Sequence, residues 1–261
     1  MKWRCFQIEF RSFKSKIKTE KRRSTLALPP DDKLREIRQI NKRREKSKYL
    51  ENLKNCKKHR VGVEVGYGEL HEELFEVLEF NGKKRSKNAI IYICESYMVF
   101  KASDRTLAMA NKMRRLTKSD VYFPRYPLAP EYSIRDTVRM LYQTYKEVKK
   151  SGYEKVYLYG VGAGATLALE MCVYRNERNV AIDMPDLLVL ISPGCAPKDR
   201  EEWDRMKQYS NKDYSQAPRH LVEVKSLVSY NGFGIPDYML TCDGLNLTDF
   251  PETWFFYSNE E

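Results

Sequence analysis

The chain has 261 residues with a net charge of +11, and 42% of its residues are hydrophobic. This length suits a single domain with a full hydrophobic core. No apolar run approaches membrane-spanning length, and residues 1–23 lack the apolar centre of a secretory signal peptide. These features argue against a membrane-spanning helix and against a signal peptide.

The basic character of the chain is confined to its amino-terminal arm. Residues 1–60 hold 21 Lys and Arg against 7 Asp and Glu, which leaves 26 against 29 for residues 61–261. We therefore divide the chain into an arm, 1–60, and a body, 61–261. In the arm, Pro29-Pro30-Asp31 predicts the start of a cap-like helix over about 32–57. Its partial apolar stripe consists of Leu34, Ile37, Ile40, Leu50 and Leu53.

Two roles are open for the arm. The simpler is an amphipathic helix that packs on the body. The alternative is weak contact with an anionic surface through residues 1–60, because aromatic residues such as Trp3 and Phe6 interleave with the first basic ones. No nucleic-acid-binding module is visible, so sequence-specific binding of nucleic acid is not expected.

The body alternates between short apolar runs and segments of helical periodicity. We expect strands over 61–65, 74–80, 88–93, 121–126, 156–159, 187–191 and 253–257, and helices over 106–116, 134–149 and 165–174. The first two strands read as an antiparallel pair, with a turn at Asn81-Gly82. Such alternation predicts an α/β fold with a mostly parallel central sheet and helices on both faces. Residues 197–249 are polar and rich in tyrosine, and we expect a lid-like insertion there.

The glycines at 160, 162 and 164 stand between a predicted strand and a predicted helix. This is the layout of the nucleophile elbow, G-x-S-x-G, with Gly162 at the position of the serine. A phosphate-binding P-loop would need Gly-Lys-Ser/Thr after its glycines, and Ala165-Thr166-Leu167 supplies neither side chain. A dinucleotide-binding turn fits the glycine spacing, but the next strand ends in Ser192-Pro193-Gly194 and not in the required acid.

A second motif, Tyr126-Pro127-Leu128-Ala129-Pro130-Glu131, precedes the elbow by about thirty residues. The two motifs together resemble the hormone-sensitive-lipase-like esterases of the α/β-hydrolase fold, which carry Y-R/P-L-A-P-E and then G-D-S-A-G-G-x-L-A. The resemblance covers roughly residues 88–193 and returns faintly over 250–261. It implies an α/β-hydrolase fold that is incomplete at its carboxyl end. It also implies a small ester or acyl ligand in the cleft.

The resemblance also shows which catalytic groups are replaced. Members of this family carry H-G-G-G after an earlier strand, where backbone N–H groups stabilise the oxyanion. Here the strand over 88–93 leads into Cys94, Glu95 and Ser96. The family order Ser, Asp/Glu, His places Glu261 near the position of the acid, with no histidine after it. His220 lies before that position and is a poor general base. We therefore expect a catalytically inactive member of a hydrolase family.

The alternative is an active short-chain carboxylesterase whose carboxyl-terminal part is lost or supplied elsewhere. Loss of the end would account for the histidine, but it would not account for Gly162 or for the turn at Cys94-Glu95-Ser96. Oligomeric state is left open. We expect no metal and no cofactor.

Several other side chains invite a catalytic role and have simpler interpretations. Glu131 and Asp136 stand at a predicted helix start, where capping and ion pairing are common. Ser192 ends a strand and suits a turn. The tyrosines of the lid could line a pocket or pack among themselves; they are Tyr209, Tyr214, Tyr230 and Tyr238.

The cysteines show no paired metal or redox spacing. They stand at positions 5, 56, 94, 172, 195 and 242. Their scatter through apolar segments predicts reduced, buried thiols and a cytoplasmic protein. Cys94 could be imagined as a nucleophile, but the sequence places no histidine to activate it, and core packing is the better interpretation.

Overall fold

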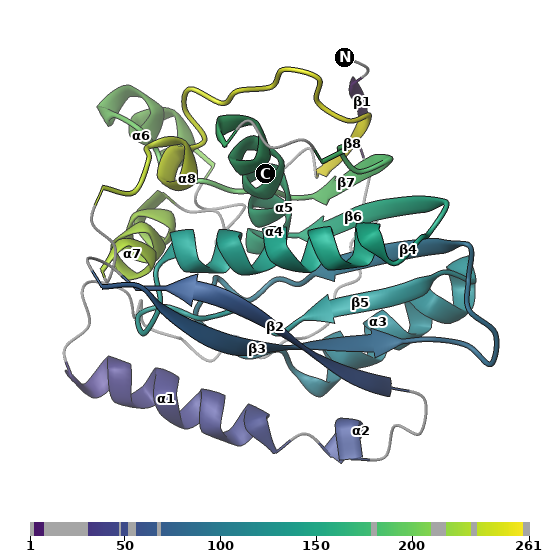
Figure 1. Ribbon diagram of the computed structural model, residues 1–261. Coiled ribbons are helices and arrows are strands. Elements are labelled where there is room, and N and C mark those ends of the chain that lie inside the picture. The colour runs from purple at the N-terminus through teal and green to yellow at the C-terminus, as the bar shows by residue number, and fades with distance from the viewer. Residues whose placement is uncertain are drawn as a thin grey trace.

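The central feature of the computed structural model is one twisted sheet with helices on both of its faces (Figure 1). The described residues are 3–7, 31–46, 48–51, 56–66, 69–178, 182–209, 218–230 and 234–257. Every helix among them is too short or too polar to cross a lipid bilayer.

The sheet has eight described strands in the order β1-β8-β7-β6-β4-β5-β3-β2. Their bounds are β1 Trp3–Gln7, β2 Cys56–Val65, β3 His71–Phe80, β4 Asn88–Ile93, β5 Asp120–Pro124, β6 Lys155–Val161, β7 Leu187–Ile191 and β8 Thr253–Tyr257. The strands from β1 to β5 in this order are parallel, whereas β3 and β2 are antiparallel. The mostly parallel sheet predicted from the alternation is confirmed.

The central strands are rich in apolar residues because both faces of the sheet are covered. In β4 every residue from Ala89 to Ile93 is buried, and in β5 all five residues are buried. The helices α4 (Ile134–Lys150) and α5 (Ala163–Glu177) lie in front of the sheet in Figure 1, and α3 (Asp104–Thr117) lies behind it. The packing of helices on both faces of the sheet holds in place the loops at the carboxyl ends of β4, β5 and β6.

Local capping signals define where two of these helices begin. The Ser103 side chain accepts a hydrogen bond from the Thr106 N–H at the start of α3. At the start of α4, Ser133 and Asp136 form a capping box, in which each side chain accepts from the backbone N–H of the other residue. Helix α5 differs, because its N-cap is Gly162 and no side chain caps it.

The amino-terminal arm departs from the prediction in two ways. The helix expected over 32–57 is interrupted: α1 covers Asp31–Glu45, a single turn α2 covers Lys48–Glu51, and β2 already begins at Cys56. Strand β1 was not predicted, and it pairs in parallel with β8 at the edge of the sheet (Figure 1). The division at residue 60 stays a prediction, although both β1 and the first residues of β2 belong to the sheet.

Helix α1 packs on the body, as the simpler of the two interpretations requires. Ile37 is buried, and the Asn41 amide donates to the Val99 carbonyl at 2.9 Å and accepts from the Lys101 N–H at 2.7 Å. Residues 52–55, which include Leu53 of the predicted stripe, lie outside the described residues.

The lid-like region contains more regular structure than predicted. Its helices are α6 (Arg200–Lys207), α7 (Pro218–Ser229) and α8 (Tyr238–Thr241). A disulfide joins Cys195, just after β7, to Cys242, at the end of α8. The prediction of reduced thiols is therefore wrong for these two residues, which are 47 positions apart and become neighbours only in the fold. Cys94 and Cys172 are free and buried, as predicted, and Cys56 is free and half-buried.

Candidate functional site

The turn between β6 and α5 has the backbone geometry of an elbow. Gly162 adopts φ 53° and ψ −125°, a conformation that L-residues rarely adopt. Its N–H donates to the Ile191 carbonyl of β7 at 2.8 Å, and its carbonyl accepts from the Ala165 N–H at 2.9 Å. These bonds hold the sharp turn at the carboxyl end of the sheet. In open α/β sheets this is the end at which ligands bind.

The two flanking glycines are required by close packing. A β-carbon on Gly160 would lie 2.5 Å from the Ala165 Cα, and one on Gly164 would lie 2.6 Å from the Cys94 carbonyl oxygen. Both neighbours are backbone atoms that cannot move aside. The glycines therefore let α5 approach β6 and β4 closely, which explains the glycine-dense motif without any ligand.

Gly162 is different because its side-chain direction is open. Among the described residues, a β-carbon there would meet only the Glu95 Cβ within 4 Å, at 3.4 Å. A side chain at position 162 would therefore point at the turn that follows β4. The structure thus brings together the two degenerate segments identified in the sequence, Gly162 and Cys94-Glu95-Ser96.

The turn after β4 has its polar groups engaged within the protein. The Tyr126 hydroxyl, from the Leu-Ala-Pro-Glu motif, donates to the Cys94 carbonyl at 3.0 Å. The Ser96 hydroxyl lies 2.5 Å from the same Tyr126 oxygen and donates to it, since the tyrosine proton is already used. Cys94, Ser96 and Tyr126 are all buried, whereas Glu95 is exposed. This turn therefore places Glu95, an acidic residue, beside position 162.

The Cys94 thiol is poorly suited to act as a nucleophile. Burial raises the pKa of this thiol to about 12, and the neighbouring Glu95 carboxylate adds to the rise. Because the thiolate is the reactive form, a buried thiol with such a pKa is inert near neutral pH. Burial also holds the pKa of Tyr126 well above its ordinary value.

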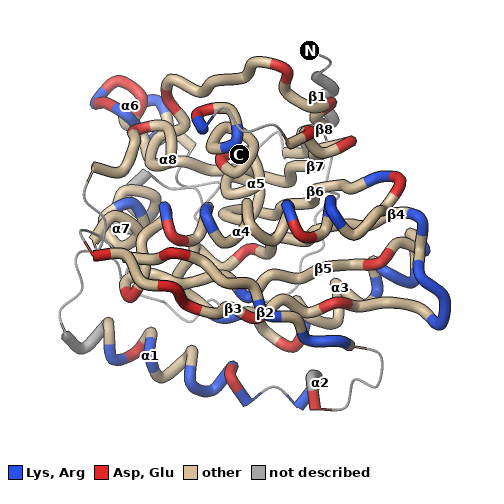
Figure 2. Tube along the Cα trace, in the orientation of Figure 1, with Lys and Arg blue, Asp and Glu red and all other residues tan. Residues whose placement is uncertain are grey.

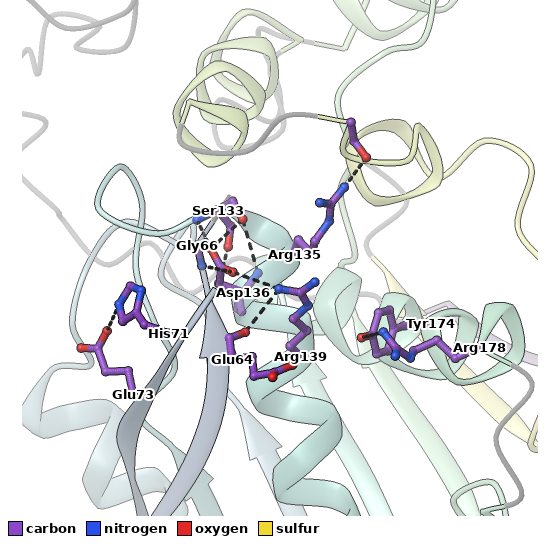
Figure 3. Close-up of polar contacts among 12 residues, drawn as sticks. Glu64, Gly66, His71, Glu73, Ser133, Arg135, Asp136, Arg139, Tyr174 and Arg178 are labelled. Carbon is purple, nitrogen blue, oxygen red and sulfur yellow. Dashed lines mark hydrogen bonds and ion pairs between the residues drawn. The ribbon is translucent and has the colours of Figure 1, made fainter. Parts of the chain in front are cut away.

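Asp136 and Glu131 have structural partners. The Asp136 carboxylate accepts from the Ser133 N–H and hydroxyl at 3.0 and 2.8 Å and lies 3.7 Å from Arg139 (Figure 3). It also accepts from the Gly66 N–H at 3.3 Å, which ties α4 to the end of β2. Glu131 pairs with Arg38 of α1 at 3.4 Å. Both side chains therefore act in capping and ion pairing.

The two histidines whose side chains are described, His59 and His71, each lie beside a glutamate. His59 lies 2.5 Å from Glu79, and His71 lies 3.8 Å from Glu73. His220 belongs to α7, but its side chain lies outside the described residues, and so does Glu261. In the described part of the chain, no three His, Cys, Asp or Glu side chains gather closely enough to hold a metal ion.

The remaining candidates are dispersed. Ser192 directly follows Ile191, has φ 48°, and donates its N–H to the Phe256 carbonyl at 2.8 Å. Tyr209 and Tyr230 are exposed, and Tyr238 is buried. Tyr214 lies outside the described residues. The lid tyrosines therefore do not share one environment.

A cavity of about 720 Å³ lies beside the turn after β4, at the carboxyl ends of β4 and β5. Apolar residues such as Phe75, Phe123 and Leu128 line it, and Cys94 and Ser96 reach it from the turn. Ion pairs surround its opening, with Arg125 2.7 Å from Glu76 and Lys101 2.8 Å from Glu45. Gly162 does not line this cavity, so the turn at 94–96 separates it from the nucleophile position.

Sequence reasoning missed this cavity because four distant segments build it. Helix α1 supplies one side, β3 another, and the turns at 94–102 and 124–132 the rest. The Leu-Ala-Pro-Glu motif was the one available signal, because Leu128, Glu131 and Tyr132 all line the cavity.

Comparison with known protein families identifies the family of this chain. A family model described as "alpha/beta hydrolase fold" matches residues 94–261. The chain belongs to the α/β-hydrolase fold family. The match includes both degenerate segments and the Leu-Ala-Pro-Glu motif. A comparison with curated proteins finds no match.

Three of the solved structures with a similar fold are described as esterases. A candidate esterase from Staphylococcus aureus is 19% identical, with a TM-score of 0.65 over 87% of this chain and 74% of that one. A bacterial esterase of the hormone-sensitive lipase family is 17% identical, with a TM-score of 0.64 over 87% and 78%. Carboxyl esterase 2 from Tuber melanosporum is 15% identical, with a TM-score of 0.63 over 81% and 69%. At these identities the likeness establishes the fold.

Proposed function

We propose that this α/β-hydrolase homologue does not hydrolyse esters and instead binds a small ester or acyl ligand in the cavity beside the turn after β4. The observation that carries the proposal is the pairing of Gly162 with Glu95. Ester hydrolysis by this fold needs a nucleophile at position 162 and donors to the oxyanion opposite it. Here position 162 has no side chain, and the acidic residue Glu95 stands opposite it, with its Cβ 3.4 Å from a β-carbon placed at 162.

The lining of the cavity supports the ligand class. Its volume of about 720 Å³ lies within the range of small-molecule sites. The aromatic floor at Phe75 and Phe123 suits an acyl chain, and the ion pairs at the rim suit a polar end group. The turn at 94–96 would keep a bound ester away from position 162, which favours binding without turnover.

Catalysis is tested by turnover of p-nitrophenyl acetate and p-nitrophenyl butyrate by the full chain. We expect rates equal to the buffer background. Turnover above background that disappears in Gly162→Val would refute the inactive proposal and favour the alternative of an active carboxylesterase.

Binding is tested by the shift in melting temperature that ethyl butyrate and butyrate produce. Leu128→Trp should fill the cavity and remove the shift. Leu116→Trp is the matched control, because Leu116 is 72% exposed and lies outside the cavity. No shift with the wild-type chain, or an equal loss in both variants, would refute the cavity as the ligand site.

A cytoplasmic location stays a proposal. The sequence predicted this location because all thiols were expected to be reduced, and the Cys195–Cys242 disulfide contradicts that expectation for two of them. Disulfides are rare in the cytosol, so the redox state of this pair in the native protein is the deciding observation.

A further inference from the structure

A second cavity, of about 440 Å³, lies at the opposite end of the sheet from the elbow. It opens where β3 ends and where β4 and β6 begin, so it is separated from Gly162 by the length of β6, about 20 Å. Its lining residues are Lys57, Glu79, Asn81, Gly82, Lys83, Arg85, Tyr122, Ser151 and Tyr153. Nothing in the proposed function uses this cavity.

The carboxylates at this cavity are already bonded. Glu79 is buried, and its two oxygens lie 2.5 Å from the His59 ring nitrogen and 2.9 Å from the Asn81 amide nitrogen. Asp120 stands behind the cavity and accepts from the Ser86 N–H at 3.0 Å and from the Tyr153 hydroxyl at 3.1 Å. Neither carboxylate is therefore oriented to receive a ligand cation.

The cations at the cavity keep unused capacity. Lys83 is exposed and has no hydrogen-bond or ion-pair partner among the described residues. The Arg85 guanidinium lies 4.4 Å above the Tyr153 ring and donates to the Ser151 carbonyl. A guanidinium has five N–H donors, so most of those of Arg85 stay available. Lys57 lies 3.9 Å from Glu79, which is a loose ion pair.

The surroundings add positive charge. Lys84 is exposed next to Lys83, and a β-carbon on Gly82 would lie 3.6 Å from the Arg114 Nη1. Figure 2 shows this concentration as blue segments where β3 leads into β4. The cavity is therefore a concave site with several cationic side chains, and its carboxylates are engaged in hydrogen bonds within the protein.

We propose that this cavity binds a small molecule that carries two or more linked phosphate groups. Lysine and arginine are the side chains that recognise phosphate, and three of them converge here with the free N–H of the Asn81 amide. The small volume, about 440 Å³, favours a small ligand over a nucleic acid, which would need an extended basic surface. Arg85 covers the face of the Tyr153 ring, so this face is not available to stack on an aromatic part of a ligand. The linked phosphates are therefore the group that the cavity would recognise.

The test is calorimetric titration of the full chain with inorganic pyrophosphate at physiological salt. Lys83→Gln is expected to weaken binding about tenfold, because it removes one charge-assisted contact. Lys87→Gln is the matched control: it removes the same charge nearby, but Lys87 pairs with Glu154 at 2.8 Å and does not line the cavity. This control should bind within about twofold of wild type.

Further arms separate the sources of the ligand chemistry. Binding of ADP more tightly than pyrophosphate would identify a nucleotide, and equal binding would identify the free pyrophosphate group. The proposal is overturned if pyrophosphate does not bind, or if Lys87→Gln weakens binding as much as Lys83→Gln. It is also overturned if a single-stranded RNA binds more tightly than pyrophosphate and pyrophosphate cannot displace it. Because Lys83 is exposed and unpaired, its substitution should leave the melting temperature unchanged, which separates loss of binding from loss of folding.

Discussion

A side chain at position 162 would point directly at Glu95, since a β-carbon there lies 3.4 Å from the Glu95 Cβ. This relationship joins two substitutions that stand 67 positions apart in the sequence. An α/β-hydrolase needs a hydroxyl at the first position and N–H donors near the second, because negative charge develops between them. This chain has Gly162 at the first position and Glu95 at the second. The proposal that the site has lost oxyanion stabilisation rests on this pair.

Two of the elbow glycines, Gly162 and Gly164, should respond differently to alanine. Gly164→Ala places a methyl group against fixed backbone, so we expect a loss of at least about 3 kcal/mol in unfolding free energy. Gly162→Ala has room and carries only the strain of positive φ, about 1–2 kcal/mol. Urea denaturation gives both values.

Gly244→Ala is the control for the backbone term in this series. Its φ is +67° and no atom lies within 4 Å of an added β-carbon, so it should match Gly162→Ala. If Gly162→Ala proves as damaging as Gly164→Ala, the side-chain direction at 162 is blocked, and position 162 is not an open nucleophile seat.

Gly162→Ser is not expected to create an esterase. The serine would lie beside Glu95, and the described histidine side chains, His59 and His71, pair with Glu79 and Glu73. We expect turnover of p-nitrophenyl acetate to stay at background. A rise of tenfold or more would show that a general base reaches position 162.

Glu170 provides a pH-dependent test of the core. This residue of α5 is 1% exposed, one of its carboxylate oxygens has no hydrogen-bond partner among the described residues, and burial raises its pKa well above the ordinary value. Above pH 4.5, the ordinary pKa of the group, the Glu170 carboxyl loses its proton in the unfolded chain but keeps it in the folded chain. Stability therefore falls as pH rises, by up to about 1.4 kcal/mol per unit, until the folded pKa is reached.

Glu170→Gln should remove this dependence. We expect the variant to be more stable than wild type at pH 7–8 and nearly equal to it near pH 4, as measured by thermal unfolding across pH. Glu177→Gln is the control, because Glu177 is exposed on the same helix. A wild-type advantage that grows with pH would contradict the buried, neutral state of Glu170.

The Cys195–Cys242 disulfide should stabilise the lid. It closes a long loop across 47 positions, and such a bond stabilises a protein by about 2–4 kcal/mol. We expect a reductant to lower the melting temperature of wild type and to leave the double variant Cys195→Ser/Cys242→Ser unchanged. Peptide mapping that finds both cysteines alkylated without prior reduction would contradict the pairing.

The parts of the fold predicted from the sequence are those with a local cause. Strand β7 begins and ends where predicted, Leu187–Ile191, because an apolar run lies between Asp186 and Ser192-Pro193. The elbow was also predictable, since close packing imposes glycine at 160 and 164 whatever the function. Such features depend on residues that are neighbours in the sequence.

The errors arise where distant segments decide the structure. The helix predicted to reach residue 57 ends earlier because Cys56 pairs with Phe80 of β3 and continues as a strand. Strand β1 was missed because its pairing with β8 defines it, and the basic composition of residues 1–60 suggested an arm. The Cys195–Cys242 pair and both cavities likewise depend on tertiary neighbours.

The most direct measurement is covalent labelling of the native full chain with a fluorophosphonate, followed by intact mass. An esterase nucleophile would attack the phosphorus, and the folded protein would gain one phosphonyl group. Because this chain has Gly162 opposite Glu95, the native protein should gain no phosphonyl group. A heat-denatured sample serves as the control for non-specific labelling. A single adduct that forms on the native protein, maps to one side chain and disappears after denaturation would contradict the proposal that this hydrolase fold has lost its chemistry.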